Sequence, residues 1–140
     1  TEYDPSEYDC LLFPGGFGGA KNLSDFAVKA TDGQVLDSVQ HAVRSTHALG
    51  KPIGFICITP ASVGALTLGG DGVTLTIGND QETASAIEAL GAKHQDCPVE
   101  DVVVDRDNRI VSTPAYMLGP GVKDVRAGIA KLVKEVLSMT

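Results

Sequence analysis

Short apolar runs typical of buried strands alternate with helix-like segments along this chain of 140 residues. The strand-like runs, each bounded by proline or glycine, are residues 8–13, 53–56 and 73–77. Apolar side chains recur at helical spacing over residues 35–49 and from about 120 onward. Cap and stop residues predict helices over 60–68 and 81–90, and a short helix is expected within residues 21–30. This alternation predicts an α/β fold with a mostly parallel sheet, built as a single domain over residues 1–140.

A predicted hairpin completes the expected sheet. Residues 101–105 and 109–112 are strongly β-forming and flank a polar turn. Three parallel strands and one hairpin are few strands for the sheet of a doubly wound fold.

Cys57 lies at the junction of a strand and a helix. It directly follows the run 53–56, and Thr59 and Pro60 then supply a helix N-cap and a first-turn proline. A cysteine on such a turn is raised above the sheet edge, where the N–H groups of the helix start favour the thiolate. The position therefore indicates a nucleophile, and a small buried core thiol is the alternative.

A glycine-rich loop follows the first predicted strand. Pro14-Gly-Gly-Phe-Gly-Gly places four glycines around one aromatic residue, so that backbone N–H groups can converge on an anion. The spacing matches neither the dinucleotide-binding nor the phosphate-binding glycine motif, and a tight turn is the alternative. This loop, Cys57, Gly78 and Thr113 all follow predicted strands, and functional groups gather at the carboxyl ends of parallel strands.

Charge and cysteine content argue against several classes of function. The net charge is −7 without a cluster of Lys or Arg, which disfavours nucleic acid or an anionic membrane as a partner. Apolar runs are far shorter than the roughly 20 residues of a membrane span. Three cysteines without a CxxC pair and three scattered histidines predict neither a disulfide framework nor a metal site. We expect a protein of a reducing compartment, cytoplasmic or, in a eukaryote, mitochondrial.

Five motifs resemble a known family. They are Pro14-Gly-Gly-Phe-Gly-Gly-Ala-Lys-Asn-Leu23, Gly50-Lys-Pro-Ile-Gly-Phe-Ile-Cys-Ile-Thr-Pro60, Glu88-Ala-Leu-Gly-Ala-Lys-His94, Cys97-Pro-Val99 and Val111-Ser-Thr-Pro-Ala-Tyr-Met-Leu118. In content and order they resemble the ElbB-type proteins, a branch of the PfpI, class I glutamine amidotransferase-like superfamily linked by name to isoprenoid biosynthesis. The resemblance implies a flavodoxin-like three-layer sandwich, usually dimeric. It also implies glyoxalase activity, in which glyoxal and water give glycolate without a cofactor, or deglycation of modified proteins.

Two departures from the family bear on this activity. The family carries a further strand and helix before the first residue of this chain, with an acidic residue that approaches the cysteine. We therefore expect a domain that lacks this amino-terminal portion. Relatives with hydrolytic activity often have histidine directly after the cysteine, where this chain has Ile58.

The resemblance and the positions of the motifs suggest roles for individual residues. We expect the Cys57 thiolate to attack a small aldehyde, and the N–H groups of Gly16 and Ile58 to hold the developing oxyanion. His94 is the expected base, and a structural histidine at this position is the alternative. The remaining residues expected to bind substrate are Gly15, Thr113 and Tyr116.

Two other functions compete with an aldehyde-converting enzyme. A non-enzymatic redox sensor is the main alternative, because an exposed thiolate at Cys57 is also what peroxide oxidises first. A glutaminase subunit is disfavoured, because glycine does not flank the cysteine and no histidine lies beyond His94. The cysteines expected to be structural are Cys10 and Cys97.

Overall fold

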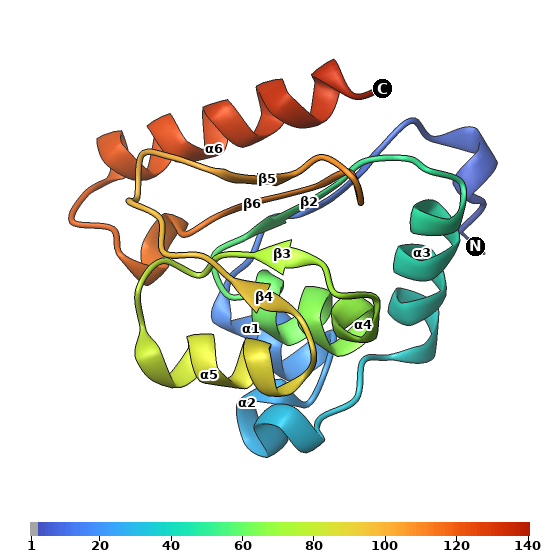
Figure 1. Ribbon diagram of the computed structural model, residues 1–140, viewed down its shortest axis with the longest axis horizontal. Helices are drawn as coiled ribbons and strands as arrows, with labels where there is room; N and C mark the ends of the chain where they lie inside the picture. Colours follow the sequence, from blue (N-terminus) through green and yellow to red (C-terminus); the bar gives the residue numbers. More distant parts are fainter. Residues whose placement is uncertain (1–2) are drawn as a thin grey trace.

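The computed structural model describes residues 3–140, and within them a four-stranded sheet has the order β1-β2-β6-β5 (Figure 1). The strands are β1 (Leu11–Phe13), β2 (Ile53–Ile56), β5 (Val103–Asp105) and β6 (Ile110–Thr113). The first two run parallel to β6, and β5 is antiparallel to it. Phe13 pairs with Phe55 and Ile56 pairs with Thr113, so the carboxyl ends of the parallel strands lie side by side.

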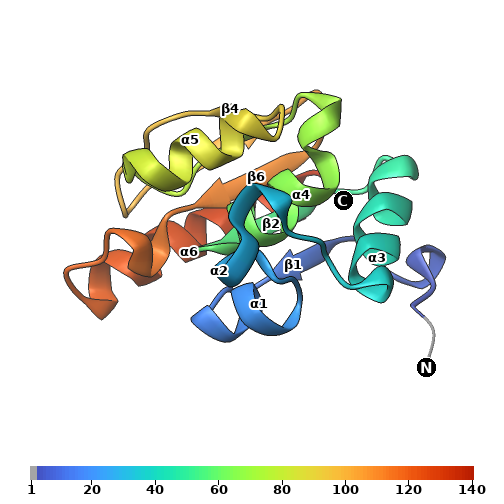
Figure 2. The ribbon, with the colours of Figure 1, turned by 90° about the horizontal axis from the view of Figure 1, so that it is seen from below.

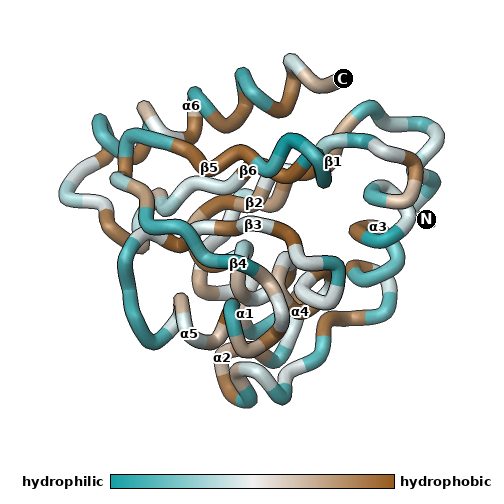
Figure 3. Tube along the Cα trace, viewed as in Figure 1, coloured by the Kyte–Doolittle hydropathy of each residue, from teal (hydrophilic) through white to brown (hydrophobic). Residues whose placement is uncertain are grey.

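Helices cover both faces of this sheet, which makes three layers (Figure 1, Figure 2). α6 (Val122–Ser138) lies along one face, and its hydrophobic side is turned toward the strands (Figure 3). Leu132 and Val136 are fully buried there. β2 carries Gly54 beneath them, where an added Cβ would lie 2.9 Å from Leu132 Cδ2. The missing side chain lets α6 pack closely on the strand that leads to Cys57.

Shorter helices cover the opposite face. They are α1 (Phe17–Asn22), α2 (Phe26–Lys29), α3 (Asp37–Ala48), η3 (Pro60–Ala65), α4 (Leu66–Leu68) and α5 (Gln81–Ala89). Single 3₁₀ turns are η1 (Pro5–Glu7), η2 (Ala30–Asp32), η4 (Gly69–Asp71) and η5 (Ala115–Met117). η3 is a π-helical turn with all of its residues buried. It packs on the central strand, because Gly64 allows the Phe55 ring to approach.

One predicted strand lies outside the main sheet. The run 73–77 shortens to β3 (Thr74–Leu75), which pairs with β4 (Lys93–His94) in a separate parallel ribbon. Backbone N–H groups of the run 73–77 donate to side chains of the main sheet. Thr74 N donates to Asp105 Oδ2 at 2.8 Å, and Thr76 N donates to Ser112 Oγ at 2.9 Å. Because side chains replace strand carbonyls as acceptors, β3 rests against β5 and β6 without joining their ladder.

The other predicted elements are present, several with shorter bounds. β2 coincides with the predicted run, whereas residues 8–13 shorten to β1, so that Cys10 precedes the strand. α5 begins after Asp80, whose carboxylate accepts the Thr83 N–H at 3.0 Å as an N-cap. The helix predicted over residues 60–68 begins as the π-turn η3. The mostly parallel α/β architecture is therefore confirmed.

Candidate active site

The chain turns sharply from β2 into η3 at Cys57, and we call this turn, residues 56–59, the elbow. Cys57 has a φ of +66°, a left-handed conformation that costs a non-glycine residue roughly 1–3 kcal/mol. Its N–H donates to the Thr113 carbonyl oxygen at 3.0 Å, which extends the pairing of β2 with β6. The residue is partly exposed. The elbow thus places a strained, accessible cysteine at the carboxyl edge of the sheet.

Thr59 holds the elbow together. This buried residue accepts the Ile56 N–H at its Oγ1, at 2.9 Å. Its hydroxyl proton can go to the Ile56 carbonyl at 2.8 Å or to the Phe13 carbonyl at 3.3 Å. Thr59 occupies the predicted N-cap position and Pro60 begins the first turn, but the Thr59 backbone is already helical and its side chain makes no capping hydrogen bond. The hydroxyl instead joins the ends of β1 and β2.

Replacing Thr59 with valine should lower the free energy of unfolding by about 1–3 kcal/mol, because the buried Ile56 N–H loses its acceptor. The elbow should loosen, and the rate at which iodoacetamide labels Cys57 should change with it. Thr59→Ser is the matched control, since it keeps the hydroxyl. Urea denaturation and peptide mass spectrometry measure the two effects. Equal decreases in the free energy of unfolding in Thr59→Val and Thr59→Ser would contradict a stabilising role of the hydroxyl.

The glycine loop lies directly against the elbow. Gly15 and Gly16 have φ values of +95° and +91°. A Cβ at Gly15 would lie 2.8 Å from Cys57 Cβ and 2.8 Å from the Ile56 carbonyl oxygen, so glycine is required for this approach. Within residues 3–140, the N–H groups of Gly16 and Ile58 donate to no acceptor. These are the two N–H groups predicted to hold an oxyanion.

The two residues predicted from the end of β6 have different surroundings. Thr113 reaches the elbow through its carbonyl group, while its buried side chain donates to the Asp101 carbonyl oxygen at 2.7 Å. Ala115 then takes a left-handed φ of +47°. Tyr116 follows in η5 and is 62% exposed.

His94, the predicted base, lies in the separate β3–β4 ribbon. Its side chain is only 4% exposed, and Nε2 accepts the Ile77 N–H at 3.3 Å. Burial lowers the pKa of His94, against an opposing effect of the nearby Asp96 and Glu88 carboxylates. The Asp96 carboxylate lies 3.6 Å from Nδ1. In the described part of the chain, these polar contacts tie the ring to the ribbon and its loop, and none joins it to Cys57.

The lowered pKa of His94 predicts a loss of stability in acid. The unfolded chain binds a proton at this residue near pH 6.5, whereas the folded chain does so only at lower pH. The free energy of unfolding should therefore fall as the pH drops below 6.5, and His94→Gln should flatten this dependence. Urea denaturation between pH 7 and about pH 5 measures it. His41→Gln, at an exposed histidine, is the control. Parallel curves for wild type and His94→Gln would contradict the prediction.

An apolar groove of about 320 Å³ adjoins the elbow. Phe17, which follows Gly16, and Ile58, which follows Cys57, both line it. Glu82 contributes its only carboxylate. The other lining residues are Ala20, Phe26, Ala27, Ala30, Thr83 and Ala86. Sequence reasoning gave Phe17 and Glu82 no role at the site, although the position of Phe17 next to the predicted oxyanion glycine was an available signal.

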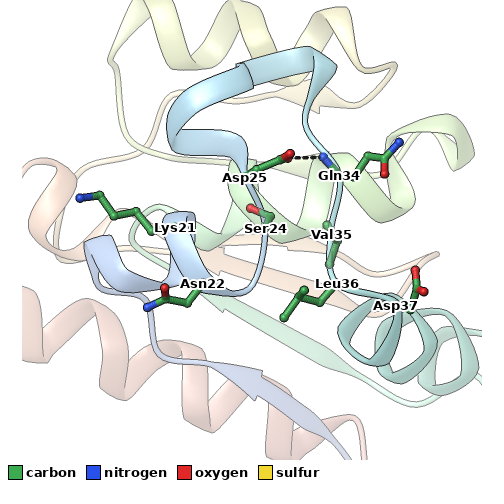
Figure 4. Close-up of a pocket in the computed structure, with 8 residues that line it drawn as sticks. All are labelled: Lys21, Asn22, Ser24, Asp25, Gln34, Val35, Leu36 and Asp37. Atoms are coloured by element: carbon green, nitrogen blue, oxygen red, sulfur yellow. Dashed lines mark hydrogen bonds between the residues drawn. The ribbon is translucent and has the colours of Figure 1, made fainter.

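A more polar cavity of about 360 Å³ lies between the α1–α2 segment and the start of α3 (Figure 4). The Asp25 carboxylate accepts the Gln34 N–H across it. Its walls are Lys21, Asn22, Ser24, Asp25, Gln34, Val35, Leu36 and Asp37. None of the residues predicted for the site is among them, so the groove at the elbow is the better candidate for a substrate site.

Two further features concern metals and membranes. Within residues 3–140, no three His, Cys, Asp or Glu side chains come together as a metal-binding group. Every helix in that range falls short of the length or hydropathy needed to span a bilayer.

Comparisons with known proteins support the family resemblance in its broader form. The human mitochondrial glutamine amidotransferase-like class 1 domain-containing protein 3 is 40% identical over 144 residues, which cover 96% of this chain and 53% of that protein. The rat mitochondrial ES1 protein homolog is 40% identical over 149 residues, which cover 100% of this chain and 55% of that relative. The chain is therefore similar to glutamine amidotransferase-like class 1 domain proteins over part of their length. No family model matches it.

A solved amidotransferase-like structure has the same fold. The isoprenoid biosynthesis protein with amidotransferase-like domain from Ehrlichia chaffeensis superposes with a TM-score of 0.86 at 34% identity, covering 99% of this chain and 63% of that one. The flavodoxin-like fold is thereby confirmed, and the ElbB branch stays a prediction. The chain spans about half the length of these two curated relatives, 53% and 55%. Both are named as mitochondrial proteins.

Proposed function

We propose that this amidotransferase-like chain is a cofactor-independent glyoxalase that converts glyoxal and water to glycolate, with Cys57 as the nucleophile. The elbow carries the proposal: a partly exposed cysteine with a φ of +66° lies against Gly15. The N–H groups of Gly16 and Ile58, which follow these two residues, have no acceptor within residues 3–140. Addition to a carbonyl group needs a nucleophile for the carbon and N–H donors for the developing oxyanion, and the elbow offers both.

The reaction rearranges glyoxal and adds one water. Cys57 Sγ bonds to one aldehyde carbon, and the carbonyl oxygen becomes the hydroxyl of a hemithioacetal. A base removes the proton from that carbon, a proton is delivered to the second carbon, and the hydroxyl proton of the hemithioacetal passes to the second carbonyl oxygen. The first carbon is thereby oxidised to a thioester, and the second is reduced to an alcohol. Water then displaces the sulfur and releases glycolate.

Two side chains compete for the role of the base. His94 is the candidate from the sequence, but its Nε2 accepts the Ile77 N–H and its ring is buried in the β3–β4 ribbon. Glu82 lines the groove that Ile58 and Phe17 share. We assign the proton transfer to Glu82, because it lines this groove together with Ile58, the neighbour of Cys57 in the elbow. A kcat that falls in Glu82→Gln but not in His94→Gln supports this assignment, and the reverse result contradicts it.

A redox sensor is the second candidate, and it too uses Cys57. Peroxide oxidises an accessible thiolate first to a sulfenic and then to a sulfinic acid. Cys97 is buried, and burial, aided by the Asp101 carboxylate, raises the pKa of its thiol to about 11. Hydrolytic relatives often have histidine directly after the cysteine, whereas this chain has Ile58, which cannot act as a base. This difference favours a sensor over a hydrolase.

Glycolate formation distinguishes these functions. Purified protein incubated with ¹³C-labelled glyoxal should produce glycolate, detected by nuclear magnetic resonance, without any added cofactor. A parallel sample treated with mild peroxide reports the oxidation state of each cysteine by peptide mass spectrometry. Absence of glycolate together with selective sulfinic acid at Cys57 would favour the sensor. Equal oxidation of all three cysteines would count against it.

The assembly and location are also proposals. The family resemblance favours a homodimer, and sedimentation should then give twice the mass of the chain; a monomer at all concentrations would contradict this. We also propose a location in a reducing compartment, cytoplasmic or mitochondrial, because the three cysteines are free and thiols stay reduced there. Fractionation of cells that express the natural protein tests the location, and recovery outside both compartments would oppose it.

A further inference from the structure

One flank of α6 is polar and points toward the β5 side of the sheet. Lys131 Nζ lies 3.5 Å from the Asp101 carboxylate, and the Arg106 guanidinium lies 3.6 Å from the Glu135 carboxylate. Asp101 and Arg106 stand on either side of β5, so these two ion pairs show where this flank of the helix lies. Because β1 is at the other margin of the sheet, the opposite flank of α6 points toward β1.

The flank that points toward β1 is apolar and open. Leu12 of β1 lies on the same face of the sheet as α6, because a Cβ at Gly54 would meet both Leu12 and Leu132, yet Leu12 is 37% exposed. On the helix, Val122 is 70% and Leu137 is 58% exposed. Helical spacing puts them on one flank with two partly buried residues. We call this surface the open strip, and its residues are Leu12, Val122, Ile129, Val133 and Leu137.

The two ends of the open strip carry opposite charges. Arg109, just before β6, donates from Nη1 to the Met139 carbonyl oxygen at 2.8 Å, so α6 ends where the parallel strands begin. Exposed charges flank both ends of the strip: Lys123 and Arg126 in the first turns of α6, and Glu7 and Asp9 just before β1. Within residues 3–140, none of these four side chains is in an ion pair. The strip is therefore basic at one end and acidic at the other.

We propose that the open strip binds the open strip of a second copy of this chain, with the two α6 helices antiparallel across a two-fold axis. The axis places the same surface on both sides, so the apolar side chains of the two copies cover one another. It also brings the basic end of each strip to the acidic end of the other, with Arg126 of one copy near Asp9 of its partner. This inference rests on the proposed homodimer and names the surface that forms it.

A charge placed in the open strip tests the surface. Val122→Glu and Leu137→Glu should each raise the dissociation constant of the dimer, measured by sedimentation, by about tenfold or more, because the carboxylate would be buried without a partner. Val28→Glu is the matched control, at a valine of α2 that is 84% exposed on the other side of the sheet, and it should keep the wild-type constant. Urea denaturation confirms that each variant folds. A dimer whose constant is unchanged in both strip variants would overturn this surface and leave the homodimer standing, whereas a monomeric wild type would overturn both.

Exchanging the charges tests whether the partner is a second copy in this orientation. Arg126→Glu alone and Asp9→Lys alone should each weaken the dimer, because each brings like charges together at both ends of the interface. A mixture of the two variants should form a heterodimer about tenfold or more tighter than either homodimer, because both contacts then join opposite charges. Lys134→Glu, at an exposed position of α6 outside the strip, is the control and should show no such preference for Asp9→Lys. If the Arg126→Glu and Asp9→Lys chains do not prefer each other, the proposed pairing is wrong.

Discussion

Glycolate formation by Cys57→Ser should fall by on the order of 10³-fold or more, which amounts to no detectable turnover. Serine fits the same space and can take the same left-handed backbone conformation. A hydroxyl without an adjacent base is nevertheless a far weaker nucleophile than a thiolate. The loss therefore reports chemistry and not folding, provided that urea denaturation gives the variant a free energy of unfolding close to that of the wild type.

The other two cysteines provide controls for this result. Cys10→Ser alters a half-buried thiol that precedes β1, and Cys97→Ser alters a buried thiol whose pKa is raised to about 11. Neither should lose turnover beyond what a change in stability explains. Wild-type turnover in Cys57→Ser would remove the proposed mechanism, and equal losses in all three variants would point to general destabilisation.

Features that depend on neighbouring residues could be predicted from the sequence. The bounds of β2 follow from four apolar residues between Pro52 and the turn that leads to Pro60. Asp80 caps α5 because a carboxylate three residues before Thr83 can reach its N–H. The elbow at Cys57 follows from a strand that meets a helix start without a spacer. In each case the partner lies within a few residues, so the spacing alone reveals it.

Features that depend on distant residues could not be predicted. Thr59 has the chemistry of an N-cap, yet its hydroxyl is close to both the Ile56 backbone and the end of β1. β3 has the composition of a sheet strand, but it bonds to the side chain of Asp105, 31 residues away. The groove brings α1, α2 and α5 to the elbow, and no spacing in the sequence indicates that these segments meet. Only the tertiary packing supplies these partners.

Gly15→Ala is expected to have the second large effect, on both stability and glycolate formation, because the glycine loop is in contact with the elbow. Its Cβ would lie 2.8 Å from both Cys57 Cβ and the Ile56 carbonyl oxygen, on a backbone with a φ of +95°. Strain of about 1–3 kcal/mol and a similar cost of overpacking should together lower the free energy of unfolding by roughly 2–6 kcal/mol. The backbone carbonyl cannot yield without moving Cys57, so glycolate formation should fall as well.

Gly16→Ala separates backbone strain from this clash. Gly16 has a similar φ of +91°, but a Cβ there would meet no atom within 4 Å. Gly16→Ala should therefore lower the free energy of unfolding by only about 1–3 kcal/mol, measured by urea denaturation in parallel with Gly15→Ala. A loss in Gly15→Ala that exceeds the loss in Gly16→Ala measures how tightly the loop is packed on Cys57. Equal losses would mean that the loop can move away from the elbow, and a loop that moves away could not hold the Gly16 N–H in place for an oxyanion.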